Sequence, residues 1–248
     1  MTKTNLYVGT SGWQYADWKG RFYPDGLKKT SQLAYYCGRF NSVEINSTFY
    51  RMPSESAVNS WAVTTSQEFI FSVKASRFFS HSKRLIVDQN FSDRLKLFQD
   101  RLRPLSNKLG VVLIQLPPNF PADIGRLKNA AEAFSRINTR TAFEFRNDSW
   151  FKPEVFEILK KHNMANVINS AGGRWPESKQ ITADFAYIRF HGGKSLYRSS
   201  YSASELHKWS GFIKKLKLAH VFVYFNNDFH AHAVNNANEL LKLLKEVL

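Results

Sequence analysis

The sequence predicts an α/β protein, a single (β/α)8 TIM-type barrel domain over residues 1–248. Three observations support this prediction. Short apolar segments alternate with segments of helical period, which is typical of a parallel sheet covered by helices. About eight such units fit into a chain of this length, which is the usual size of the barrel. Polar residues also gather at the carboxyl ends of the expected strands, where such barrels carry their sites.

The first half of the chain contains four expected strands. They lie at residues 6–9, 42–46, 69–74 and 110–116. The last of them is an almost continuous apolar run, as a buried parallel strand should be. Ser31 is placed to cap a helix that runs to about residue 39, and Met52-Pro-Ser54 precedes a second helix.

Two long connections stand between these strands. The segment 13–23 is rich in aromatic residues, which form either a lid over the core or a stacking wall for a ligand. Residues 75–108 form an extended, basic and partly helical excursion after the third strand. From Lys74 to Lys108 there are nine Lys or Arg against three Asp. That charge belongs either to a solvated helix face or to a basic arm beside the site.

The second half repeats the alternation. Strands are expected at 141–146, 164–170, 185–191 and 221–225, and helices at about 123–136, from Pro153, around 206–216 and around 240–247. In the strand at 141–146, Phe143 and Phe145 alternate with Glu144 and Arg146. A period of two places both charges on one face of the strand and both aromatic rings on the other.

Composition and charge limit the classes of function. One cysteine, Cys37, excludes an internal disulfide framework and a multi-cysteine zinc site. The sequence has no apolar run long enough for a membrane helix, and its first seven residues do not resemble a signal peptide. We therefore expect a cytoplasmic protein with no membrane partner. The net charge of +15 indicates an anionic partner or a basic surface without one.

Strand ends define a candidate site. The candidate catalytic residues are Glu44, Glu144, Lys74 and His191. The candidate substrate-binding residues are Asn46, Gln115, Arg146, Arg189, Gly192, Lys194, Asn226, Asn227, Trp13 and Tyr50. Two glutamates facing Lys74, Arg146 and Arg189 leave one cation without a counter-charge, so we expect a bound anion to complete the set. The turn at 192–194 follows the seventh strand, where this fold often holds phosphate.

The residue types leave several chemistries open. A glutamate beside arginine would act as a base or nucleophile, and paired carboxylates also suit glycoside hydrolysis. Lys74 could form a Schiff base and His191 could carry a proton. A metal would have to draw on a set without characteristic spacing, so we predict no cofactor and leave a divalent metal as the alternative. That set is Glu44, Glu144, His191, Asp228 and His230.

The same residues carry a family resemblance. The matching stretches are Gly9-Thr-Ser-Gly-Trp13, Phe22-Tyr-Pro24, Val43-Glu-Ile-Asn-Ser-Thr-Phe-Tyr50, Phe71-Ser-Val-Lys-Ala75, Gln115-Leu-Pro-Pro118, Phe143-Glu-Phe-Arg146, Ser149-Trp150, Arg189-Phe-His-Gly192, Phe225-Asn-Asn227 and Asn236-Ala237. They span nearly the whole chain, which resembles the YecE-like family, a domain of unknown function. The resemblance implies a TIM barrel and no particular activity. Barrels of the xylose-isomerase and endonuclease IV kind are similar in fold alone.

Two departures from the family pattern bear on chemistry. Asn169-Ser170 stands where the family tends to carry an acidic residue, which weakens any mechanism that needs a third carboxylate or a metal. Asp228-Phe-His-Ala231 stands where the family tends to have a glycine, which indicates a changed loop after the eighth strand.

Three functions are compatible with this pattern. The first is an enzyme, of the hydrolase, lyase or isomerase class, that acts on a small anionic and phosphorylated substrate at the mouth of the barrel. The second is a nucleic-acid-binding or endonuclease IV-like protein, because phosphates pair with basic residues and bases stack on aromatic rings. The third is a non-catalytic binding module. The sequence does not determine the oligomeric state.

Overall fold

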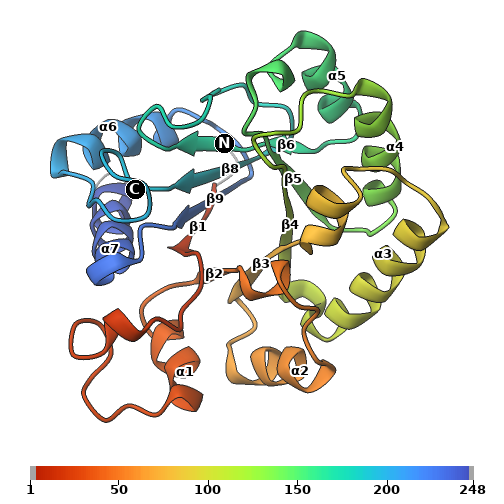
Figure 1. Cartoon of the computed structure of the whole chain (residues 1–248). Helices are drawn as coiled ribbons and strands as arrows, with labels where there is room; N and C mark the ends of the chain where they lie inside the picture. The colour runs from red at the N-terminus through yellow and green to blue at the C-terminus, as the bar shows by residue number, and fades with distance from the viewer. Residues whose placement is uncertain (1–3, 246–248) are drawn as a thin grey trace.

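Nine parallel strands form two sheets in residues 4–245, the part of the chain that this computed structural model describes. One sheet has the order β1-β9-β8-β7 and the other β2-β3-β4-β5-β6. The strands are β1 Asn5–Thr10, β2 Ser42–Ile45, β3 Ile70–Lys74, β4 Leu109–Gln115, β5 Arg140–Glu144, β6 Ala165–Asn166, β7 Ile168–Ser170, β8 Phe185–Phe190 and β9 His220–Phe225. Figure 1 shows the strands at the centre and the helices around them. The prediction of an α/β fold with parallel strands is confirmed.

The two sheets meet at two seams. At the first seam, Ser11, directly after β1, forms a bridge with Glu44 of β2, and Gly12 N donates to Glu44 O at 2.7 Å. The second seam lies within residues 164–170, and the prediction of a single strand there is wrong. The segment is split at Val167, because β6 pairs with β5 whereas β7 pairs with β8. The chain thus changes sheets within one extended segment, and the hydrogen-bond ladder is not a closed ring.

Seven α-helices lie outside the strands in the described residues. They are α1 Gln32–Cys37, α2 Glu55–Thr64, α3 Gln89–Leu102, α4 Ile124–Ser135, α5 Pro153–Lys161, α6 Ala203–Lys214 and α7 His232–Lys245. Side-chain oxygens of Ser54 and Asp88 accept hydrogen bonds from the first turns of α2 and α3, which stabilises both starts. Ser31 does not cap α1, because its backbone is already in the helical region and its side chain makes no capping bond. Val247, expected in the last helix, lies outside the described residues.

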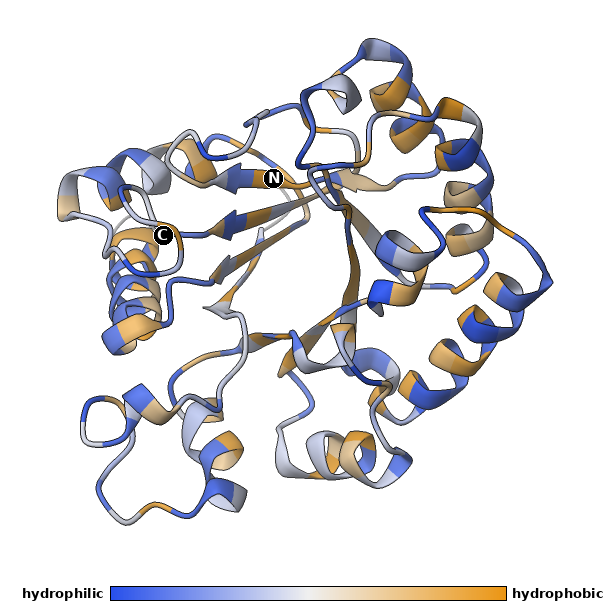
Figure 2. Cartoon of the chain, in the orientation of Figure 1, coloured by the Kyte–Doolittle hydropathy of each residue, from blue (hydrophilic) through white to orange (hydrophobic). Residues whose placement is uncertain are grey.

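The core has two parts. The larger cluster lies between strands and helices and contains Phe143 and Phe145, the aromatic face predicted for the fifth strand. A smaller cluster, which includes Val111, Leu113 and Tyr224, lies on the opposite faces of the strands. Helix α3 turns its apolar residues toward the sheet and its hydrophilic residues outward (Figure 2). This arrangement confirms the helix predicted within residues 75–108.

The aromatic segment 13–23 packs as a lid. Trp18 and Tyr23 are fully buried and belong to the large cluster. Trp18 Nε1 donates to Asp228 O at 2.9 Å, which ties the segment to the loop after β9. These two rings therefore cover the core, whereas Trp13 and Tyr15 of the same segment line a small cavity. No helix in the described ranges is both long and apolar enough to cross a bilayer.

Candidate functional site

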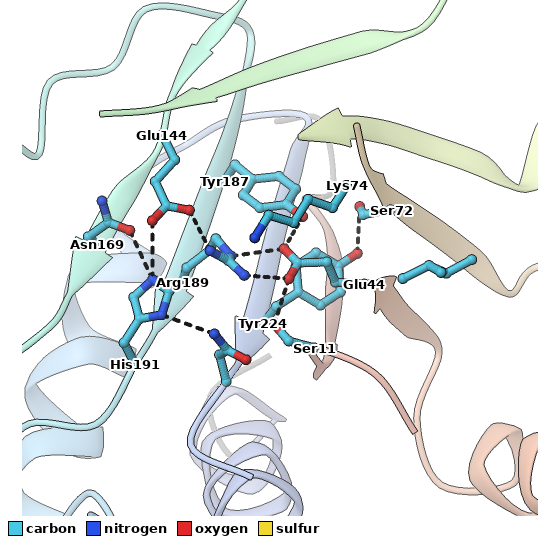
Figure 3. Close-up of polar contacts among 12 residues, drawn as sticks. Ser11, Glu44, Ser72, Lys74, Glu144, Asn169, Tyr187, Arg189, His191 and Tyr224 are labelled. Carbon is cyan, nitrogen blue, oxygen red and sulfur yellow. Dashed lines mark hydrogen bonds and ion pairs between the residues drawn. The ribbon is translucent and has the colours of Figure 1, made fainter. Parts of the chain in front are cut away.

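A buried ion-pair cluster lies at the carboxyl ends of the strands. Arg189, near the end of β8, donates to Glu44 through Nε at 2.9 Å and Nη2 at 2.7 Å, and through Nη1 it also bonds Glu144. All three side chains are fully buried. Glu44 comes from β2 and Glu144 from β5, so one guanidinium joins strands of both sheets (Figure 3). These three charged side chains, expected on the inner faces of their strands, therefore lie together in the structure.

The Glu44 carboxylate is fully engaged. Besides Arg189, it accepts hydrogen bonds from Ser11 Oγ at 2.6 Å and from Tyr187 OH at 2.6 Å. Four donors therefore reach its two oxygens, close to the number of lone pairs that a carboxylate offers. A carboxylate held in this way fixes Arg189 and has little capacity left to accept a substrate proton.

Glu144 anchors a second arginine, nearer to solvent. Arg146 Nε donates to Glu144 Oε1 at 2.8 Å, and the Arg146 guanidinium lies 3.7 Å from the centre of the Trp175 ring. Burial alone would raise the pKa of Glu144, but Arg146 and Arg189 outweigh it and hold this pKa well below its usual range. Glu144 is therefore a stable carboxylate. The terminal nitrogens of Arg146 make no hydrogen bond within the described residues, and its side chain is 11% exposed.

His191 is held as a neutral ring. Burial, followed by the charge of Arg189, lowers its pKa well below the ordinary value of 6.5. Asn169 Oδ1 lies 3.3 Å from Nε2 and Asn226 Nδ2 lies 3.2 Å from Nδ1. These contacts suit the tautomer in which Nε2–H donates and Nδ1 accepts, because the side-chain NH2 of Asn226 is a donor. Glu144 Oε1 lies 3.6 Å from Nε2.

Lys74 is the cation that this cluster leaves without an ion pair. It is 9% exposed, and its Nζ lies 4.3 Å from the centre of the Phe49 ring. Its ammonium group makes no hydrogen bond or ion pair with any residue in the described part of the chain. Burial, followed by the charge of Arg189, lowers its pKa from 10.5 to about 7, against the opposing effect of Glu144. The Lys74 amine therefore loses its proton at a much lower pH than that of an exposed lysine.

The turn after β8 uses its backbone donors internally. Gly192 N donates to Tyr201 OH at 3.0 Å, and the N–H groups of Lys194 and Ser195 both donate to Ser199 Oγ at 3.0 Å. Gly192 has a φ of +97°, which explains the glycine. Two of the N–H groups of the expected phosphate cradle at 192–194, those of Gly192 and Lys194, are therefore occupied.

The remaining candidates lie around the cluster. Asn227 Nδ2 donates to Ser199 O and to Asn236 Oδ1, both at 2.9 Å, so this side chain fastens the loop after β8. Gln115 is buried beside Glu144 in the strand register. Asn46 and Trp13 line a separate cavity of about 210 Å³. Tyr50 is 76% exposed and lies on the rim rather than in the cluster.

Four residues contribute to the site beyond the predicted set. Ser11 and Tyr187 bond Glu44, Asn169 contacts His191, and Trp175 covers Arg146. The first three were visible as polar residues on the inner faces of strands. Trp175 lies in the loop after β7, and nothing in the sequence indicated which residue its ring would contact.

The metal alternative draws no support from the arrangement of side chains. Within residues 4–245, no three His, Cys, Asp or Glu residues are close enough together to hold a metal ion. Glu144 and His191 lie close to each other, and both already contact other groups. Asp228 and His230 belong to the 3-10 turn before α7.

These features define an α/β protein with a buried, charged cluster at the carboxyl ends of its parallel strands. The chain belongs to the family described as protein of unknown function DUF72, whose model matches residues 7–247. It is 29% identical to the UPF0759 protein YunF of Bacillus subtilis, over 96% of this chain and 94% of that protein. It is 31% identical to the UPF0759 protein YecE of Escherichia coli K12, over 46% of this chain and 39% of that protein. The resemblance to the YecE-like family is thereby confirmed.

Solved structures agree with this assignment. A DUF72 family protein from Thermotoga maritima superposes with a TM-score of 0.87 at 29% identity, covering 97% of this chain and 99% of that one. A D-psicose 3-epimerase superposes with a TM-score of 0.59 at 9% identity, covering 100% of this chain and 99% of the epimerase. The second likeness shows the fold alone.

Proposed function

We propose that this chain is a single-domain (β/α)8 barrel enzyme that acts on a small anionic substrate at the carboxyl ends of its strands. The observation that carries the proposal is the state of Lys74. A lysine that is almost buried, makes no hydrogen bond or ion pair in the described residues and has a pKa of about 7 is unusual as a purely structural residue. Perturbed groups of this kind are concentrated at functional sites.

Arg146 supplies the anion-binding group. Its Nε is fixed by Glu144 and its plane is covered by Trp175, so the guanidinium is held in one orientation. Its two terminal nitrogens remain for a ligand and form the planar fork that binds carboxylate or phosphate with two hydrogen bonds. An anion here would also raise the fraction of protonated Lys74, because an opposite charge favours the charged amine.

The catalytic roles then fall to Lys74 and His191, and the carboxylates position the arginines. Lys74 in its uncharged form accepts a proton or attacks a carbonyl carbon. The glutamates were expected as base or nucleophile, but their contacts favour another role. Glu44 accepts four hydrogen bonds and Glu144 is held ionised by two arginines, so both orient Arg189 and Arg146. His191, neutral and fixed by Asn169 and Asn226, is the second proton carrier.

Thermal stability in the presence of ligands tests this proposal. The panel contains inorganic phosphate, sugar phosphates, nucleotides, small carboxylates and neutral sugars, each at low and moderate salt. A ligand at about 100 times its Kd stabilises the fold by ~2.7 kcal/mol, which is a readily measured shift. We expect stabilisation by one class of small anion and none by neutral sugars.

Two variants identify the site. Arg146→Ala should abolish the ligand shift, and Lys74→Met should abolish turnover of the substrate so found while binding is retained. The matched control is Arg136→Ala, which replaces an exposed arginine that follows α4 and pairs with Glu132, and it should behave as wild type. An anion that stabilises Arg146→Ala as strongly as wild type would exclude the site proposed here.

A further inference from the structure

We propose that the rim of the site binds a single strand of nucleic acid, in a basic and aromatic pocket next to the Lys74 cluster. The pocket, called the rim pocket below, is a cavity of about 360 Å³. It is lined by Tyr50, Arg51, Met52, Ser76, Arg77, Phe78, Phe79, Ser82 and Arg94. This inference concerns binding and does not depend on which reaction occurs at Lys74.

Three arginines surround the rim pocket, and their charges are not compensated locally. Arg51 follows β2, Arg77 follows β3, and Arg94 projects from α3. All three are exposed, and none forms an ion pair with an Asp or Glu in the described residues. No acidic residue lines the pocket. Arg103, Arg126 and Arg136 pair with carboxylates, whereas the three at the rim pocket are unpaired within the described part of the chain and surround one cavity.

Aromatic rings accompany these charges. Tyr50 is 76% exposed, an unusual state for so large a ring. Phe49 holds it from one side, with the two ring centres 5.0 Å apart at nearly a right angle. A second ring, that of Phe78, lies 5.3 Å from the guanidinium of Arg94 on α3. An exposed ring beside unpaired guanidinium groups is the combination that binds single strands, since bases stack on the ring while phosphates contact the cations.

The rim pocket is linked to the buried cluster through Phe49. Phe49 contacts Tyr50, and the centre of its ring also lies 4.3 Å from Lys74 Nζ and 5.0 Å from the centre of the His81 ring. Burial, followed by the charges of Lys74 and Arg77, lowers the pKa of His81 to about 4. The positive potential of the rim therefore extends to the mouth of the site, and a chain of phosphates could follow it.

A single strand fits this surface better than a duplex. Stacking on Tyr50 requires a base whose face is free, and the bases of a duplex are stacked on one another. The net charge of +15 favours a polyanion over one isolated phosphate, because it attracts each further phosphate of a chain. Two of the basic residues in the segment 75–108, Arg77 and Arg94, thus line this pocket.

Fluorescence anisotropy of a labelled oligonucleotide tests the proposal. The probe is a single-stranded oligonucleotide of about 12 nucleotides, within the range that one such site covers. We expect binding whose logarithm falls linearly with the logarithm of salt concentration, with a slope of about −2 for three phosphate contacts. A mononucleotide, the matching duplex and vesicles of an anionic phospholipid serve as competitors. Each should displace the probe less effectively than an unlabelled single strand.

Two variants locate the site. Arg77→Ala combined with Arg94→Ala should weaken binding at least tenfold at low salt and reduce the slope by about 1.4, or about 0.7 for each contact. Tyr50→Ala should weaken binding by about 5- to 150-fold and leave the slope unchanged, because stacking is not a charge interaction. The control combines Arg39→Ala with Arg136→Ala, which removes the same charge elsewhere. Arg39 also stacks on a tyrosine, at the amino end of the strands.

Three results would overturn the proposal. The first is a control variant that loses as much affinity as the pair at the rim pocket, since binding would then follow net charge alone. The second is a mononucleotide that competes as well as the oligonucleotide. The third is binding of vesicles, but not of the oligonucleotide, that depends on the rim arginines. Failure of this proposal leaves the Lys74 site untouched, because Arg146 and Lys74 are unchanged in every variant.

Discussion

Replacement of Arg189 by methionine gives the sharpest test of the buried cluster. Methionine keeps an unbranched side chain and removes the guanidinium that donates three hydrogen bonds to Glu44 and Glu144. Glu44 then loses its only ion-pair partner in the described residues and keeps the neutral donors Ser11 and Tyr187. Removal of one member of a buried ion pair costs about 3–5 kcal/mol, because the remaining charge stays desolvated. Against a domain stability of about 5–15 kcal/mol, this loss is large.

The assay is urea unfolding of wild type and Arg189→Met at pH 5 and pH 8. Without the guanidinium, folding buries carboxylates that bind protons more readily than in the unfolded chain, so acid favours the folded variant. We therefore expect the deficit of the variant relative to wild type to be smaller at pH 5 than at pH 8. A deficit below about 1 kcal/mol that does not depend on pH would refute the reasoning.

A double variant separates charge from packing. Glu44→Gln and Arg189→Met together remove both charges of the Glu44–Arg189 ion pair while keeping similar volumes, and Glu144 keeps Arg146 as its ion-pair partner. Neutral replacement of a buried ion pair is often close to neutral for stability. We expect the double variant to recover most of the loss seen with Arg189→Met alone, and no recovery would show that packing around Arg189 dominates.

Three further predictions concern other parts of the molecule. Wild type should gain stability from pH 7 to pH 9.5 relative to Lys74→Met, because in that window Lys74 binds fewer protons in the folded state than in the unfolded chain. Urea titrations of both proteins at the two pH values measure this gain, and an equal change in both proteins would contradict it. Asn169→Asp should raise the pKa of His191 by adding a carboxylate to its Nε2 side, as seen in an NMR titration of the ring; an unmoved resonance would contradict it. Gly172→Ala should destabilise the fold by roughly 1–2 kcal/mol more than Gly173→Ala. A Cβ added at Gly172 would lie 1.6 Å from Gly193 O, whereas a Cβ added at Gly173 meets no atom within 4 Å. Equal shifts of the melting temperature in the two variants would contradict this.

Much of the site was predictable because it depends on strand periodicity. Glu144 and Arg146 share a face with a period of two, and the same rule places Tyr187, Arg189 and His191 together. Parallel strands then bring their carboxyl ends to one edge, so residues about 145 positions apart, such as Glu44 and Arg189, meet. The excess cation was also predictable from charge counting, although only the contacts show that it is Lys74.

Loops were less predictable because no simple period governs them. The turn at 192–194 has glycines suited to a phosphate, but Tyr201 and Ser199 take its backbone donors. Trp175 reaches Arg146 from a loop whose path the sequence does not specify. The split of the expected strand at Val167 follows from pairing with two different sheets, which depends on partners distant in the chain.

The pairing of β1 with β9 affects the order in which the chain folds during its synthesis. Residues 5–10 pair with residues 220–225, so the first strand has no partner beside it in its sheet until nearly the whole chain has been synthesised. At about 5–20 residues per second, that delay is roughly 10–40 s. The sheet from β2 to β6 can assemble during this time, because its strands are all complete by residue 166. Since Arg189 emerges after both of its glutamate partners, the two carboxylates remain without their shared cation until the second sheet begins to form.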